Sequence, residues 1–131
     1  MCTSHDVEDK TEVADPRGGF TRVEDWPRYP PEMHFEMGSG VAVDRDGIIY
    51  LFTRDIEHWA THPLAFKDKM GKSSISMFNR DGDYLGKWGP SDERGFALGG
   101  HTLYIENDGM FWTTDRDGHT VKKYHPSGGL L

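Results

Sequence analysis

Three histidines, His101, His119 and His125, lie close together in the sequence, between short runs that have the composition of β-strands. Neutral imidazole is the commonest metal ligand in proteins, and three histidines with an open fourth position form a typical catalytic zinc site. Histidines in turns and at the ends of strands serve equally well as hydrogen-bonding partners. The residue types alone leave both interpretations open.

The local sequence separates these histidines from one another. His125 precedes Pro126 in an expected turn, so we expect its side chain to be exposed. His119 lies where a strand is expected to begin, and a structural hydrogen bond is expected there. A second pair, His58 and His62, has a spacing of four that suits a metal only on a helix, and no partner carboxylate accompanies it. A metal-site hypothesis therefore depends on His101.

The composition favours one small domain built from short strands. The chain has 131 residues, of which 35% are hydrophobic and 12% aromatic. Sixteen glycines and seven prolines predict frequent turns. The net charge of −7 argues against electrostatic binding to nucleic acid or to an anionic membrane surface.

The sequence also bears on the location of the protein. A single cysteine, Cys2, excludes a disulfide within the chain and a cysteine zinc site. The first residues, MCTSHDVEDK, are polar and acidic, unlike a secretory signal. No run approaches the ~20 apolar residues of a membrane span. We therefore expect a cytoplasmic protein.

The chain divides into three parts. Residues 1–19 are polar and predict a disordered or loosely attached tail. Residues 20–38 contain several prolines, which oppose a helix or a central strand, and predict an extended lead-in. Three aromatic residues of this lead-in are expected to cover an apolar surface: Trp26, Tyr29 and Phe35. Residues 39–131 show regular alternation and Asp-Gly turns.

Two units with the same order of strands make up this third part. The unit at 39–90 has expected strands at 40–44, 48–54, 73–80 and 83–89. The unit at 99–131 has expected strands at 101–106, 110–115 and 119–125, and 126–131 leads to the position of a fourth. Some aspartates resemble calcium-loop acids by type, but hairpin-turn chemistry explains Asp46, Asp81 and Asp117 without any metal.

The two units are copies of an internal repeat. A shift of 62 residues aligns their first two strands, for example Val41 with Leu103. A shift of 46 aligns their third strands, for example Phe78 with Tyr124. The difference of 16 is an insertion within residues 55–72, and such insertions often lie on the binding face of a repeat protein.

Four antiparallel strands per unit and a pitch of about 40–50 residues are typical of propeller blades. The expected fold is all-β, with two four-stranded antiparallel blades that form a partial propeller. Two blades leave two apolar faces bare. Either the chain is the leading part of a longer protein, or copies self-associate through these faces, and three copies of two blades would make six.

Three segments resemble NHL repeats: GVAVDRDGIIYLFTRD, ISMFNRDGDYLGKWG and GHTLYIENDGMFWTTDRDGHTVKKYHPSG. More narrowly, residues 20–131 resemble about two of the six blades of peptidyl-α-hydroxyglycine α-amidating lyases and their bacterial relatives. The lead-in VEDWPRYPPEMHFEMGSGVAVD is similar to the segment before the first blade of that family. The resemblance implies a six-bladed β-propeller that cleaves peptidyl-α-hydroxyglycine to an amide and glyoxylate.

The same resemblance implies two metal ions, zinc and calcium. Three histidines from different blades hold the zinc in that family, and His101 in GGHTL stands at the place of one of them. Gly100 and Thr102 replace the proline and the glycine that flank the family's histidine. The family's structural calcium is bound partly through main-chain carbonyls, and the matching positions are Val41 and Leu103.

A catalytic arginine is also implied, and Arg54 in FTRD matches its position, although Thr53 and Asp55 replace both neighbours of the family motif. The family's remaining histidines and its tyrosine belong to blades outside the matched part, so the chain would hold only part of such a site. The alternative is a non-catalytic NHL-type propeller that binds a peptide, a protein or a carbohydrate. The expected partner is therefore a small peptide-like substrate or a protein.

Overall fold

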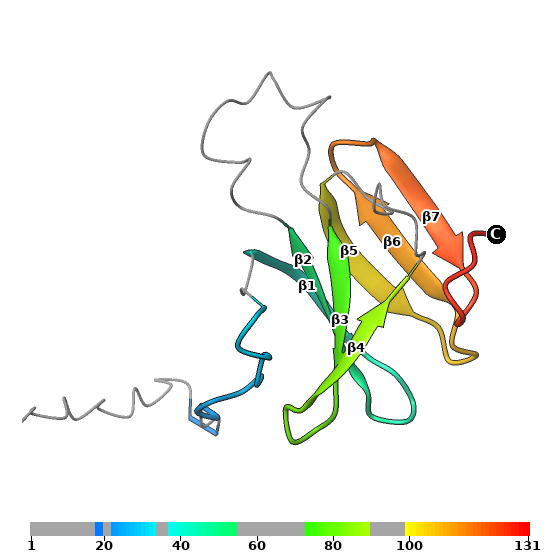
Figure 1. Cartoon of the computed structure of the whole chain (residues 1–131). Coiled ribbons are helices and arrows are strands. Elements are labelled where there is room, and N and C mark those ends of the chain that lie inside the picture. The colour runs from blue at the N-terminus through cyan, green and yellow to red at the C-terminus, as the bar shows by residue number, and fades with distance from the viewer. Residues whose placement is uncertain (1–17, 20–21, 34–36, 55–72, 90–98) are drawn as a thin grey trace, which may run out of the picture.

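The structure is a computed structural model of the whole chain, and it describes residues 18–19, 22–33, 37–54, 73–89 and 99–131. These residues form two antiparallel sheets and contain no helix, which confirms the all-β class (Figure 1). Several sequence predictions lie outside the described residues. They concern Cys2, Phe35, most of the tail, and the insertion at 55–72 with His58 and His62.

Sheet 1 has the strand order β1-β2-β3-β4, and sheet 2 has the order β5-β6-β7. The strands of sheet 1 are β1 (Met37–Val43), β2 (Ile49–Arg54), β3 (Ser74–Phe78) and β4 (Tyr84–Trp88). The strands of sheet 2 are β5 (Gly100–Ile105), β6 (Phe111–Asp115) and β7 (Thr120–Tyr124). Where the sequence predicts the beginning of a fourth strand, Tyr124 forms an isolated bridge with Leu130.

The two sheets repeat the same backbone structure. The first hairpin of each sheet is irregular at an equivalent point, between Gly38 and Gly40 in sheet 1 and between Gly100 and Thr102 in sheet 2. The turns that follow also match, because the amide of Gly47 donates to Asp44 and that of Gly109 donates to Glu106. Both turn glycines have a positive φ, +83° and +89°, which a side chain would strain. The two sheets therefore repeat the same backbone hydrogen bonds as well as similar residue types.

One side-chain hydrogen bond is also repeated, although both of its residues differ in type between the two sheets. In sheet 1 the hydroxyl of Tyr50 donates to Asp44 at 3.1 Å. At the equivalent place in sheet 2 the indole nitrogen of Trp112 donates to Glu106 at 2.7 Å. Each copy thus joins an aromatic donor on its second strand to a carboxylate at the end of its first.

The Tyr50 contact makes stability depend on pH. Burial raises the pKa of the Tyr50 hydroxyl to about 12, and the hydrogen bond to Asp44 also raises it because the bond needs the proton. Tyrosine in the unfolded chain titrates near a pKa of about 10. The contribution of Tyr50 to stability is therefore complete below about pH 10 and is lost as the pH rises through about 12.

We expect Tyr50→Phe to reduce the fall in unfolding free energy between about pH 10 and 12, because phenylalanine cannot lose a proton. Urea unfolding of both proteins across this range measures the difference. Tyr104→Phe is the matched control, since it removes the hydroxyl of an exposed tyrosine. Equal slopes for Tyr50→Phe and the parent chain would contradict the expectation.

The two sheets pack face to face through side chains that alternate along their strands. We call the face of a sheet that carries Tyr50 or its repeat equivalents the front face, and the opposite face the rear face. The front face of sheet 1 packs on the rear face of sheet 2, and their buried residues form one core. Its members are Tyr50, Phe52, Ile75, Leu103, Phe111 and Tyr124.

Close contacts fix the relation of the two sheets. Phe111 of sheet 2 stacks on Trp88 of sheet 1 with ring centroids 3.8 Å apart, and meets Tyr50 edge-on at 4.9 Å. Strands β1 and β5 lie side by side, and a Cβ atom added to Gly40 would stand 3.1 Å from the Cα of Thr102. The glycine therefore permits the first strands of the two sheets to approach each other.

The lead-in covers part of the rear face of sheet 1. The ring of Tyr29 meets Phe78 edge-on at 5.1 Å, and the ring of Trp26 lies 6.1 Å from it. Arg28 holds the lead-in in place, because its backbone nitrogen donates to Gly82 and its guanidinium pairs with Asp83. The sequence correctly predicts that Trp26 and Tyr29 cover an apolar surface.

Candidate functional site

The candidate site residues lie at one end of the two sheets. Strand β2 ends at Arg54, β5 begins at Gly100 and β6 ends at Asp115, and all three points are at the upper end in Figure 1. The Asp-Gly turns at 46–47, 81–82 and 108–109 lie at the opposite end. The backbone nitrogen of Gly100 donates to the buried hydroxyl of Ser73 at 3.0 Å, which ties the beginning of β5 to the beginning of β3.

Strand β5 and the turn between β6 and β7 bring two of the three histidines together. His101 and His119 both line an open pocket of about 390 Å³, together with Thr114, Thr120 and Arg116. Both imidazoles belong to exposed residues. His125 is also exposed, as predicted, but it lies in a different turn, where its Nδ1 is 2.8 Å from the hydroxyl of Ser127.

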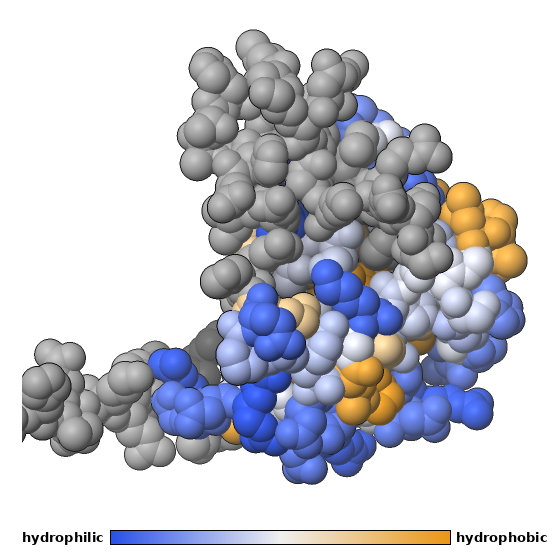
Figure 2. All heavy atoms as spheres, in the orientation of Figure 1, coloured by the Kyte–Doolittle hydropathy of each residue, from blue (hydrophilic) through white to orange (hydrophobic). Residues whose placement is uncertain are grey.

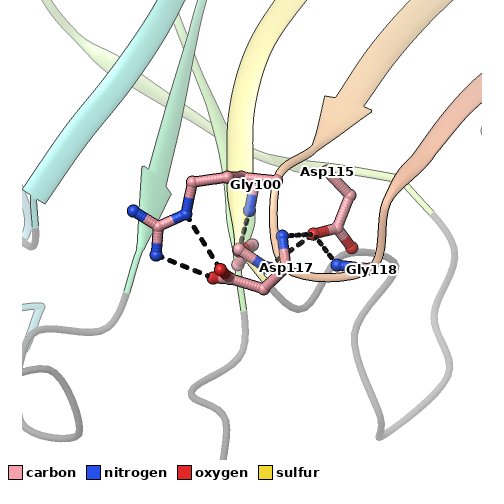
Figure 3. Close-up of polar contacts among 7 residues, drawn as sticks. Gly100, Asp115, Asp117 and Gly118 are labelled. Atoms are coloured by element: carbon pink, nitrogen blue, oxygen red, sulfur yellow. Dashed lines mark hydrogen bonds and ion pairs between the residues drawn. The ribbon is translucent and has the colours of Figure 1, made fainter. Parts of the chain in front are cut away.

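A buried carboxylate builds the turn that carries His119. One oxygen of Asp115 accepts hydrogen bonds from the backbone nitrogens of Gly99, Asp117 and Gly118 at 2.9–3.1 Å (Figure 3). Asp115 therefore joins the beginning of β5 to the turn after β6. These bonds explain the carboxylate without any metal, in the same way as hairpin chemistry explains the Asp-Gly pairs.

The same turn holds two further features of the pocket. Arg116 forms an ion pair with the neighbouring Asp117, with 2.8 Å between guanidinium and carboxylate. His119 has a φ of +51°, a backbone conformation that is uncommon for residues other than glycine. Such conformations gather at functional sites, where the surrounding structure maintains them. The fixed turn and the unusual backbone make His119 a candidate site residue. From the sequence alone, a structural hydrogen bond was the expected role of this histidine.

The zinc and calcium sites that the family resemblance implies stay predictions. Among the described residues, no group of three or more His, Cys, Asp or Glu side chains is placed to hold a metal ion. His101 and His119 together supply two imidazoles, one fewer than a three-histidine zinc site needs. The two positions implied for calcium, Val41 and Leu103, lie on the neighbouring strands β1 and β5. Their carbonyl ligation stays a prediction.

Arg54 is the last residue of β2 and is half-buried opposite Met37 of β1. It lies at the same end of the sheets as His101, on a different sheet. The catalytic role of Arg54 stays a prediction.

Comparison of the sequence with protein-family models and with curated proteins finds no match. Within the residues that the structure describes, no helix is long and apolar enough to span a membrane. The function is therefore argued from the pocket and from the arrangement of the two sheets.

Proposed function

We propose that the chain is part of an NHL-type β-propeller, works in the cytoplasm, and binds a peptide-like ligand at the end of the sheets that carries His101. The observation that carries this proposal is the pocket shared by His101 and His119. Support for the propeller comes from two sheets with repeated hydrogen bonding, stacked front to rear, with β1 beside β5.

The lining of the pocket suits a peptide. An imidazole donates from one ring nitrogen and accepts at the other, so two of them can bind both the N–H and the C=O groups of a backbone. The hydroxyls of Thr114 and Thr120 add groups that both donate and accept, and Arg116 adds positive charge near the rim. An open, shallow site of this kind holds a ligand through a few directed hydrogen bonds.

The second candidate function is the lyase chemistry that the sequence resemblance implies. The observation that favours it is the position of Arg54 and His101 at one end of adjacent sheets. In such an enzyme His101 would be one of three zinc ligands, and Arg54 would position the oxygens of the substrate. The described residues do not complete that ligand set, so we derive no reaction step from it.

Binding of a peptidyl-α-hydroxyglycine to the full chain, followed by NMR of the histidine side chains, distinguishes these functions. We expect shifts at His101 and His119, and we expect His101→Ala to weaken binding about tenfold, as loss of one hydrogen bond to a ligand does. His125→Ala is the control, because His125 lies outside the pocket.

The products decide between the two candidates. Binding without release of glyoxylate, with or without added zinc, supports the binding module. Release of glyoxylate that requires zinc and His101 supports the lyase. An unchanged affinity in His101→Ala would show that the pocket is not the binding site and would contradict both.

A further inference from the structure

We infer that the front face of sheet 2 is a docking surface for the rear face of sheet 1 in a second copy of this chain, so that copies stack head to tail. The contact would repeat the one that already joins sheet 1 to sheet 2 within the chain. This inference goes beyond the proposed function and needs neither ligand nor metal binding, but Thr114 and Val121 of this face also line the pocket, so a docked copy would cover part of it.

The front face of sheet 2 is the repeat equivalent of a surface that is buried in sheet 1. Trp112 and Val121 of sheet 2 correspond to Tyr50 and Ile75 of sheet 1, at the shifts of 62 and 46 residues. Tyr50 is 8% exposed and Ile75 is fully buried, because sheet 2 covers them. Val121, by contrast, is 66% exposed, and Tyr104 beside Trp112 is 62% exposed. Among the described residues, the front face of sheet 2 thus carries exposed apolar side chains around Trp112 and Lys123.

The rear face of sheet 1 offers the complementary surface. Val41 and Val43 correspond to Leu103 and Ile105, which pack against the core from the rear face of sheet 2. In sheet 1 these two valines are 62% and 57% exposed. The chain therefore exposes both halves of the contact that it uses internally, one on each sheet.

The lead-in shows that the rear face of sheet 1 is built to receive a preceding sheet. In the internal contact, the indole nitrogen of Trp88 donates to the carbonyl of Pro126 at 2.6 Å. On sheet 1, the indole nitrogen of Trp26 donates to the carbonyl of Arg80 at 3.3 Å. Trp26 and Trp88 are 62 residues apart, and Arg80 and Pro126 are 46 apart, which are the two shifts of the repeat. Trp26 thus stands on sheet 1 where the tryptophan of a preceding sheet would stand.

This placement leaves the part of the rear face on β1 exposed. Trp26 and Tyr29 cover Phe78 on the rear face of sheet 1, whereas Val41 and Val43 on the same face stay exposed. A second copy would bring its own Trp26 to the junction, in the position that Trp88 has at the internal junction. Both copies can therefore meet without displacing the lead-in.

The contact joins two different faces, so it is heterologous and each copy keeps one face free for another. The net charge of −7 opposes assembly at low ionic strength, and salt should favour it. We therefore expect the mass of the full chain to rise with concentration in about 0.5 M salt, where the Debye length is under 10 Å. Analytical ultracentrifugation measures this mass.

Two face variants test the geometry. Tyr104→Glu blocks the front face of sheet 2, and Val43→Glu blocks the rear face of sheet 1. Each variant alone should be monomeric at concentrations at least tenfold above those at which the parent chain associates. An equimolar mixture should form a one-to-one dimer, because each variant retains the face that the other has lost. Gly129→Glu adds the same charge at an exposed turn with open space around it and should associate as the parent chain does.

Other outcomes overturn the inference. A parent chain that stays monomeric at millimolar concentration in salt has no such contact. Association of Val43→Glu with itself would mean that two front faces pair, and failure of the mixture would mean that the two faces do not meet. Both substitutions lie at exposed positions, and circular dichroism checks that the sheets are retained. If either variant unfolds, Tyr104→Cys and Val43→Cys in a Cys2→Ser chain replace the pair, and a disulfide formed only in their mixture is the expected result.

Discussion

Phe111→Ala is expected to lower the free energy of unfolding by about 3–5 kcal/mol, the usual cost of removing a buried phenylalanine. Phe111 is 2% exposed and lies between the sheets, in ring contact with both Trp88 and Tyr50. Its removal leaves a cavity at the centre of the contact between the two sheets. A domain of this size has a total stability of about 5–15 kcal/mol, so the variant should be largely unfolded on mild heating.

Urea unfolding followed by tryptophan fluorescence measures this loss, because Trp88 stacks directly on Phe111. Val121→Ala is the control. Val121 is 66% exposed, and its truncation should change the stability by less than about 0.5 kcal/mol. A loss below about 1 kcal/mol in Phe111→Ala would contradict the packing of the two sheets described here.

Gly100→Ala should also lower the free energy of unfolding, here because the added carbon overfills the core rather than leaving a cavity. A Cβ atom at Gly100 would stand 2.1 Å from the Cζ of Phe52, whose side chain is fully buried. Overpacking of a core costs about 1–3 kcal/mol, and an overlap this severe belongs at the upper end of that range. The change should also weaken the hydrogen bond from Gly100 to Ser73, which positions the beginning of the strand that carries His101.

A second substitution isolates the cause. The atoms nearest to the added Cβ are the outer ring carbons of Phe52, which leucine lacks. In a Phe52→Leu chain, Gly100→Ala should therefore cost much less than in the parent chain, and a thermodynamic cycle of the four proteins measures the difference. Gly129→Ala, which has no atom within 4 Å of the added carbon, should be neutral. Equal costs in both backgrounds would show that the ring is not the obstacle.

The strands and their repetition could be read from the sequence because turn chemistry marks them. Asp-Gly pairs fix the hairpins, and the alternation between them fixes which residues face the core. Strand ends were less accurate, since the expected strand at 73–80 is shorter in the structure, where β3 ends at Phe78. There the backbone of Asn79 turns to bond with Asp83, a local contact that competes with the ladder.

The composition of the pocket could not be read in the same way. His101 attracted attention through its neighbours in the sequence, but its proximity to His119 depends on the bonds that Asp115 makes across 16 residues to Gly99. No local pattern encodes such a bond. The sequence predicts that Trp26 covers an apolar surface, but not that it is the repeat equivalent of Trp88. The prolines around Trp26 break the strand pattern, although its distance from Trp88 matches the repeat.

Apolar side chains are visible at the surface beside β7, near the end of the chain marked C in Figure 1 (Figure 2). Leu130, which pairs with Tyr124, and Leu131 are 61% and 69% exposed.

The two tryptophans also mark the period of the repeat, because they lie 62 residues apart and make equivalent hydrogen bonds. Trp26 precedes sheet 1 in the sequence and packs on sheet 1, and Trp88 precedes sheet 2 and packs on sheet 2. One repeat of the sequence, from one tryptophan to the next, therefore does not coincide with one sheet. An extra cassette of residues 27–88, spliced in after Trp88, would carry its own closing indole to the next junction. We expect such a chain to gain one whole sheet, with the indole of the inserted segment at the new junction.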